Sequence, residues 1–110
     1  MTLTEFIDLV VETAMSSPIC DIPLVRRLSV TAVNLRVELT VGGFVDAFYN
    51  EQTGSTAYAW IKQGRRIYGA DNTGGDWHQH PFVDPKRHEP LSGALSFADF
   101  MTEISRWISD

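Results

Sequence analysis

One stretch of nine residues constrains the fold more than any other part of the chain. Over residues 33–41 apolar side chains alternate with polar ones: Val33, Leu35, Val37, Leu39 and Val41 against Asn34, Arg36, Glu38 and Thr40. A period of two is that of a β-strand with one buried face. Gly42-Gly43 follows, and because both glycines tolerate positive φ, the pair predicts a hairpin. The chain therefore starts an antiparallel sheet here.

The length of this turn decides which side chains face the core. With a two-residue turn, Val41 would face Phe44 and Leu39 would face Asp46, which would place a carboxylate on the apolar face. A different loop length would turn every side chain of the returning strand, residues 44–50, to the other face. The sequence leaves both registers open.

Further strands and turns surround this hairpin. Residues 24–30 predict a preceding strand, residues 56–61 a following strand and residues 65–70 a short last strand, with turns at residues 51–54 and 63–64. Short connections of this kind join neighbouring strands in antiparallel order. The sequence therefore predicts a meander of four to five strands.

A capping box marks the start of each of two helices. Thr2 and Glu5 have its spacing at the N-terminus, and Ser96 and Asp99 repeat that spacing near the C-terminus. After each box apolar residues recur every three or four positions, which predicts helices over residues 3–15 and 97–108. The expected fold is a single α+β domain over residues 1–110, an antiparallel meander sheet flanked by an N-terminal and a C-terminal helix. Its expected core includes Val37, Leu39, Phe100 and Ile104.

Composition and charge exclude several classes of protein. No apolar run approaches the roughly 20 residues of a membrane span, and the N-terminal region lacks the basic residues of a secretory signal. Cys20 is the only cysteine, which rules out an intrachain disulfide and fits a reducing compartment. We therefore expect a cytoplasmic protein without membrane association. The net charge of −5 argues against broad binding to a phosphate backbone but leaves room for a small basic cleft.

Between residues 71 and 95 all periodicity is lost. Loops of this length in compact domains are usually functional, and this one holds all three histidines, with Trp77 and Phe82 to anchor it. It supplies most of a candidate site, to which the preceding strand adds two arginines. The expected catalytic residues are His78, His80, His88 and Lys86. The expected binding residues are Asp71, Asn72, Arg65, Arg66, Trp77 and Arg87.

Three roles for the histidines are open. His78 and His80 are two residues apart, so on an extended backbone both project the same way. With a third ligand such as His88, Asp71 or Asp84 they could hold Zn²⁺. Without metal they could act as general base and general acid around a phosphodiester, with a loop cation steadying the phosphate. The third role is structural, in which the rings only brace the loop. Since a single His-x-His is a weak metal signal, we expect no tightly bound metal and no cofactor.

Several motifs follow one another over the last three quarters of the chain. They are Val37-Glu38-Leu39-Thr40-Val41-Gly42-Gly43, Tyr58-Ala59-Trp60, Gly64-Arg65-Arg66-Ile67-Tyr68, Asp71-Asn72, His78-Gln79-His80-Pro81-Phe82, Lys86-Arg87-His88-Glu89-Pro90 and Ser96 before the last helix. Together they resemble the TumE-like family of small toxins encoded beside an antitoxin. The Asp-Asn pair before a His/Pro loop is the most specific part. The chain departs from the family at residues 74–77, where further proline and histidine are more common.

The resemblance implies the toxin half of a toxin–antitoxin pair that acts on RNA, with an antitoxin protein as partner. The residues it implies for the site are Asp71, Asn72, His78, His80 and His88. With the histidine loop, the expected function is that of a metal-independent endoribonuclease. The alternative is a small non-enzymatic module for protein binding or regulation, suggested by an aromatic content of 11%. A homodimer is a further expectation.

Overall fold

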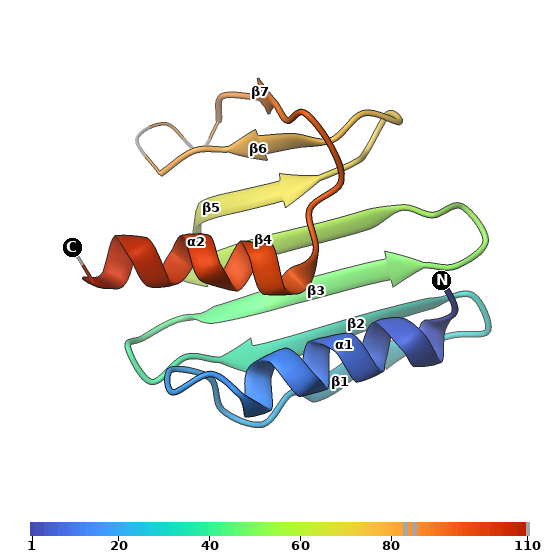
Figure 1. Ribbon diagram of the computed structural model, residues 1–110, viewed down its shortest axis with the longest axis horizontal. Helices are drawn as coiled ribbons and strands as arrows, with labels where there is room; N and C mark the ends of the chain where they lie inside the picture. The colour runs from blue at the N-terminus through green and yellow to red at the C-terminus, as the bar shows by residue number, and fades with distance from the viewer. Residues whose placement is uncertain (83, 85, 110) are drawn as a thin grey trace.

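The computed structural model describes residues 1–82, 84 and 86–109, and within them two helices and seven strands (Figure 1). In chain order these are α1 (Leu3–Met15), β1 (Leu24–Leu28), β2 (Ala32–Glu38), β3 (Phe44–Asn50), β4 (Thr56–Lys62), β5 (Arg65–Asp71), β6 (His78–His80), β7 (Glu89–Pro90) and α2 (Phe97–Ser109).

The strands form one sheet in the order β1-β2-β3-β4-β5-β6-β7, and every neighbouring pair is antiparallel. The α+β class and the meander are confirmed. The strand number is higher than expected, because β6 and β7 lie in the segment for which we expected only a loop. With three and two residues, these strands are too short to show a period in the sequence.

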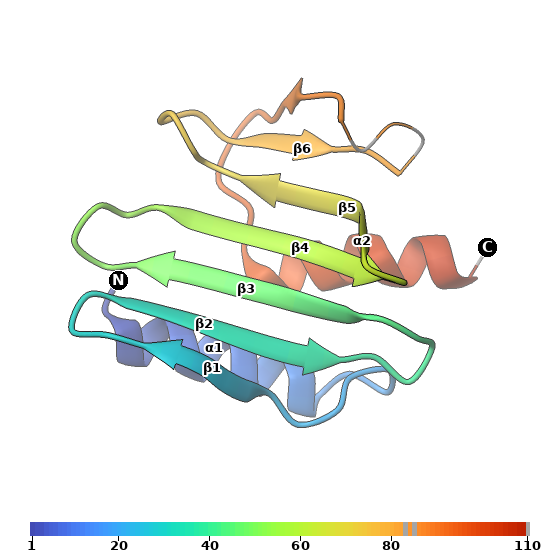
Figure 2. The same ribbon diagram turned by 180° about the vertical axis from the view of Figure 1, so that it is seen from behind.

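Both helices lie on the same face of the sheet. Figure 1 shows α1 and α2 side by side in front of it, and Figure 2 shows that neither of the two described helices covers the other face. Along β2, β3 and β4 residues are alternately buried and half-buried, and the buried set faces the helices. We call the opposite face the open face of the sheet.

The two predicted capping boxes are present. The Glu5 N–H donates to the Thr2 hydroxyl and the Thr2 N–H to the Glu5 carboxylate, at 3.1 and 2.9 Å. Ser96 and Asp99 form the same reciprocal pair at the start of α2. Each box satisfies N–H groups that the first helical turn leaves without a partner.

The core lies between the helices and the sheet. The four residues expected there, Val37, Leu39, Phe100 and Ile104, are all buried. The apolar positions of α1 and α2 that recur at helical spacing point at the sheet, as an amphipathic pattern requires.

The β2–β3 hairpin resolves the question of register. Glu38 pairs with Phe44, so the loop has five residues, 39–43, and β2 ends earlier than the alternation suggested. As a result Asp46 pairs with Arg36 on the open face, where the two side chains form an ion pair at 3.2 Å. The carboxylate is therefore not on the apolar face, and the two-residue turn is wrong.

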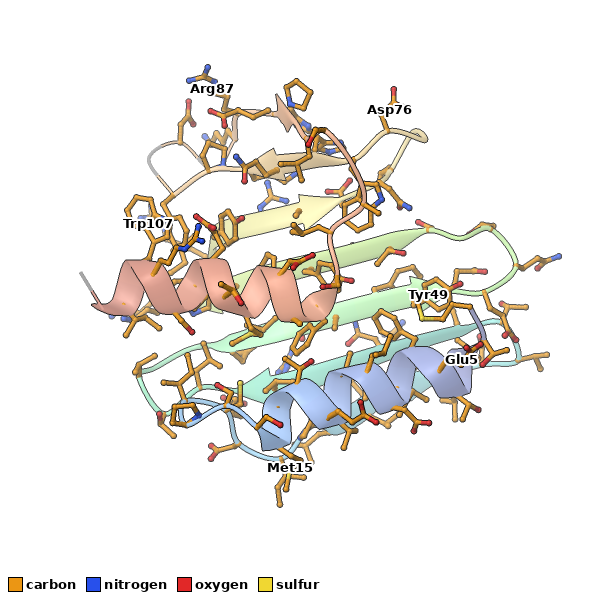
Figure 3. All side chains as sticks on the ribbon, viewed as in Figure 1. Glu5, Met15, Tyr49, Asp76, Arg87 and Trp107 are labelled. Atoms are coloured by element: carbon orange, nitrogen blue, oxygen red, sulfur yellow. The ribbon has the colours of Figure 1, made fainter. Side chains whose placement is uncertain are left out.

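The long segment after β5 is tied to the body by its aromatic residues, as expected. Trp77 stacks on Tyr58 on the helix side of the sheet. The Phe82 ring lies between those of Tyr68 and Trp107, with centroid distances of 4.4 and 4.0 Å. Figure 3 shows Trp107 near the C-terminal end of α2. This stack explains how a side chain as exposed as Trp107 still contributes to packing.

None of the described helices is both long and apolar enough to cross a membrane.

Candidate functional site

Strand pairing at one end of the sheet brings the histidines together. In the β5–β6 ladder His78 is paired with Asp71 and His80 with Gly69. Directly opposed residues of an antiparallel pair share a face. Gly69 and Asp71 are in turn opposite Ala59 and Ala57, which belong to the half-buried set of β4. The histidines of β6 therefore lie on the open face of the sheet.

The third histidine reaches the same place from the return strand. His88 immediately precedes β7, which pairs with β6 through His78↔Pro90 and Gln79↔Glu89. Its ring centroid lies 4.9 Å from that of His78 and 4.4 Å from that of His80. All three histidines of the chain thus converge, which the sequence alone could not show.

Asp71 holds two of these rings. Its Oδ1 atom lies 3.0 Å from Nε2 of His78 and its Oδ2 atom 3.2 Å from Nε2 of His80. The other ring nitrogen of His78, Nδ1, lies 3.2 Å from the Asp76 carbonyl oxygen. One carboxylate therefore orients two imidazole rings.

The three rings differ in their access to solvent. His80 is 3% exposed, the His78 side chain is 18% exposed, and His88 is at the surface. With Asp71, Thr73 and Arg66 they line an open hollow of about 430 Å³. A molecule in this hollow would meet His78 and His88 directly, with His80 behind them.

Gly69 explains how His80 can be buried on a face that no helix covers. A Cβ atom at residue 69 would lie 3.6 Å from Cδ2 of His80 and 3.1 Å from Cδ of Arg66. Arg66 therefore occupies space that a Cβ atom would take, and the His80 ring lies at van der Waals distance from the same position. An isolated glycine in a strand is a sequence signal for such a close approach, and our sequence analysis did not use it.

The charge states of Asp71 and His80 follow from their surroundings. Burial raises the pKa of Asp71, but the Thr73 N–H, the hydrogen bond with His80 and the nearby His78 together outweigh burial and lower it. Burial lowers the pKa of His80; the Asp71 hydrogen bond opposes this effect, while Arg66 and His88 add to it. Near neutral pH Asp71 is therefore ionised and His80 neutral.

These charge states determine the tautomer of His80. An ionised carboxylate only accepts hydrogen bonds, so Nε2 of His80 must carry the ring proton that faces Asp71. The Nδ1 atom then has a free lone pair. It is buried, and it has no hydrogen-bond partner among the residues that the structure describes.

A basic hollow adjoins the histidines on the same face. Arg65, Arg66 and Lys86 line it over an apolar floor of Ala59, Ile61 and Ile67, with a volume of about 710 Å³. Arg66 also lines the histidine hollow, so the two are continuous. Three expected site residues thus lie together. Arg87 lies apart from this hollow, 3.6 Å from the Glu89 carboxylate, and Figure 3 shows it at the far edge of the sheet.

Two expected site residues lie away from the histidines. Asn72 accepts a hydrogen bond from the Thr56 N–H and donates to the Gly54 carbonyl, so it joins the end of β5 to the β3–β4 turn. Trp77 packs on Tyr58 on the helix side. Asn72 and Trp77 therefore lie outside the site and support the segment that carries it. Asp84, one of the third ligands offered by the sequence, is not part of the histidine cluster.

The cluster also has the composition of a metal site. One ring nitrogen from each histidine can be chosen so that the three lie within 4.8 Å of one another. Imidazole nitrogen is a common ligand of Zn²⁺ and related ions. The arrangement therefore suits proton transfer in the free state and ion binding by the same atoms.

No protein-family model, no curated protein and no solved structure matches this chain.

Proposed function

We propose that the protein is an endoribonuclease that uses its histidine cluster for metal-independent proton transfer. The observation that carries the proposal is the convergence of the three histidines around Asp71, in an open hollow continuous with a basic one. Histidine is the side chain that exchanges protons near neutral pH, and cations beside it can bind a phosphate.

Exposure distinguishes the roles of the three rings. His78 and His88 can meet a substrate, so they are the proposed proton-transfer pair. One of them takes the proton from the ribose 2′-hydroxyl as its oxygen attacks phosphorus, and the other protonates the departing 5′-oxygen. Both nitrogens of His78 lie close to oxygen atoms, those of the Asp71 carboxylate and the Asp76 carbonyl, which orient its ring. The buried His80 is a positioning residue.

The basic hollow supports RNA as the substrate. Its three cationic side chains make this part of the surface positive although the net charge of the chain is −5. They lie beside the histidines, where a phosphate would be cleaved. Its apolar floor offers a surface on which a neighbouring base can lie. A small basic cleft of this kind fits a short single-stranded segment better than a long duplex.

Cleavage of a single-stranded RNA with chelator present tests the proposal. His78→Ala and His88→Ala should each lower the rate by about 10²–10⁴-fold, the usual contribution of one proton-transfer group. Asp84→Ala changes the same loop outside the cluster and serves as the control. Full activity in both histidine variants, with unchanged melting, would refute the catalytic assignment. A strict need for added metal would refute metal independence.

The proposed toxin role rests on the resemblance to TumE-like proteins and makes a separate prediction. Expression of the chain should slow growth, and co-expression of the protein encoded beside it should restore growth. His88→Ala should abolish the inhibition while the protein accumulates to the same level. An equally toxic His88→Ala variant would separate toxicity from the histidine cluster.

The edge strand β1 favours a second candidate function, binding of a protein partner. All five of its residues are exposed, and Leu24, Val25 and Leu28 are among the exposed large apolar side chains. An edge strand with free backbone groups can pair with a strand of another chain, either an antitoxin or a second copy. Val25→Lys should weaken such an association in analytical ultracentrifugation, whereas Leu9→Lys on α1 should not.

A further inference from the structure

The three histidines of the cluster have a second use. We propose that His78, His80 and His88 bind one divalent transition-metal ion of the Zn²⁺ class. Three imidazole ligands would leave the fourth tetrahedral position to water or another small molecule. The proposal goes beyond RNA cleavage, and ion binding does not depend on it.

The first support is the spacing of the rings. Ligand nitrogens around a tetrahedral Zn²⁺ ion, with bonds of about 2.0–2.1 Å, lie about 3.3 Å apart. In this structure one nitrogen from each ring can be chosen so that the three lie within 4.8 Å of one another, and such a set needs to close by about 1.5 Å at most. His88 is exposed, and rotation of its side chain can supply most of this movement without disturbing the core.

The second support is the unpaired nitrogen of His80. Its Nδ1 atom is buried and lacks a hydrogen-bond partner among the described residues. A buried polar atom without a partner costs free energy, and an ion that accepts its lone pair would remove that cost. The Nε2 atom of the same ring is already held by Asp71.

The third support is Asp71 itself. A histidine that gives one nitrogen to a metal usually donates the other N–H to a carboxylate or a carbonyl, which orients the ring. Asp71 makes this contact with both His78 and His80. To bind an ion, His78 must give up one of its two oxygen partners, and the exposed contact with the Asp76 carbonyl is the easier one to lose.

The charges around the cluster favour an ion with an anionic fourth ligand. The Asp71 carboxylate, in contact with two of the rings, offsets part of the positive charge, while Arg66 lines the same hollow and opposes a bare cation. An anion such as hydroxide or a phosphate oxygen on the ion would lie near this guanidinium. An ion held there would occupy the nitrogens that proton transfer requires, so loading would switch the proposed cleavage off.

Calorimetric titration with Zn²⁺ alone tests ion binding directly. The full chain, without an affinity tag, is stripped with chelator and dialysed before the titration. We expect one ion per chain with a dissociation constant below about 10 µM. His88→Ala should weaken binding more than about tenfold, and Asp71→Asn by about 10–100-fold. Because His88 is exposed, its variant should keep the fold, which thermal melting verifies.

Two variants control for other ligands. Cys20→Ser removes the only thiol, and Asp84→Ala removes a carboxylate of the same loop; both should bind Zn²⁺ as the wild type does. Absence of binding in the wild type, unchanged binding in a folded His88→Ala variant, or loss of binding in Cys20→Ser would each overturn the proposal. Since the titration contains no RNA, failure of the cleavage proposal would leave this result intact.

Discussion

Gly69 and His80 are opposite each other in the β5–β6 ladder, and the imidazole ring lies over the strand where residue 69 has no side chain. The site therefore depends on a backbone position that performs no chemistry.

Gly69→Ala should displace the Arg66 side chain and press on the backbone of Tyr58, whereas the new Cβ would only touch His80, at 3.6 Å from Cδ2. The added Cβ would lie 3.2 Å from the Tyr58 carbonyl oxygen and 3.1 Å from Cδ of Arg66, which is tighter than ordinary packing. We expect a loss of about 1–3 kcal/mol in denaturant unfolding, the usual cost of overpacking. Gly93→Ala is the control, because a Cβ there meets nothing within 4 Å. Equal stability in the two variants would contradict this account.

Gly43→Ala should destabilise the β2–β3 hairpin more than Gly64→Ala destabilises the β4–β5 hairpin. Both glycines have nearly the same positive φ, 76° and 75°, so the backbone strain is matched. Only at residue 43 would the new Cβ collide with a carbonyl oxygen, that of Ile61. The difference in unfolding free energy between the two variants measures this collision. If Gly43→Ala and Gly64→Ala lose the same unfolding free energy within about 0.5 kcal/mol, the collision with the Ile61 carbonyl does not destabilise the hairpin.

Leu39→Ala should cost about 2–5 kcal/mol of unfolding free energy, since it leaves a cavity in the core. Leu39 is 5% exposed although it lies in the turn after β2, where its N–H bonds to the Gly43 carbonyl. Val41→Ala in the same turn is the control, because Val41 is exposed. A Leu39→Ala variant within about 0.5 kcal/mol of wild type would show that this side chain is not part of the core.

Stability should fall as the pH drops from neutral to about 5 in the presence of chelator. The pKa of His80 is lowered in the folded protein, so between that value and the ordinary 6.5 the unfolded chain binds more protons. The contribution of His80 to the free energy of unfolding is complete above pH 6.5 and is lost as the pH falls through this window. Asp71, whose pKa is lowered from 3.8, adds a second loss at more acidic pH.

His80→Gln isolates the histidine part of this dependence. The variant lacks the titrating ring, so its unfolding free energy should decline less between pH 7.5 and 5 than that of the wild type. Chemical denaturation at several pH values gives both curves. Parallel curves over this range would show that the loss comes from other groups.

Several elements could be predicted because their signals are local. Each capping box lies within four consecutive residues, and the helical stripes repeat within one or two turns. Strands β2, β3 and β4 are long enough for alternation to show. For these parts the residue pattern and the final burial agree, because neighbours in sequence decide them.

The candidate site was predicted as a set of residues but not as an arrangement. The sequence placed all three histidines in one segment and included Asp71 among the expected binding residues. It left open whether the rings meet, and it put the proton-transfer pair at His78 and His80. Exposure in the folded chain favours His78 and His88 instead, since burial of His80 depends on Gly69, Arg66 and His88 together.

By itself, the sequence determined the α+β class, the two helices and the location of the unusual segment, because helix caps and hydrophobic periods are properties of neighbouring residues. Only the tertiary structure decided the five-residue turn after β2, the strands β6 and β7, and the meeting of the three histidines around Asp71. These features depend on hydrogen bonds between strands and on space left by a residue in another strand. Such contacts form only when the sheet assembles, and no local pattern contains them.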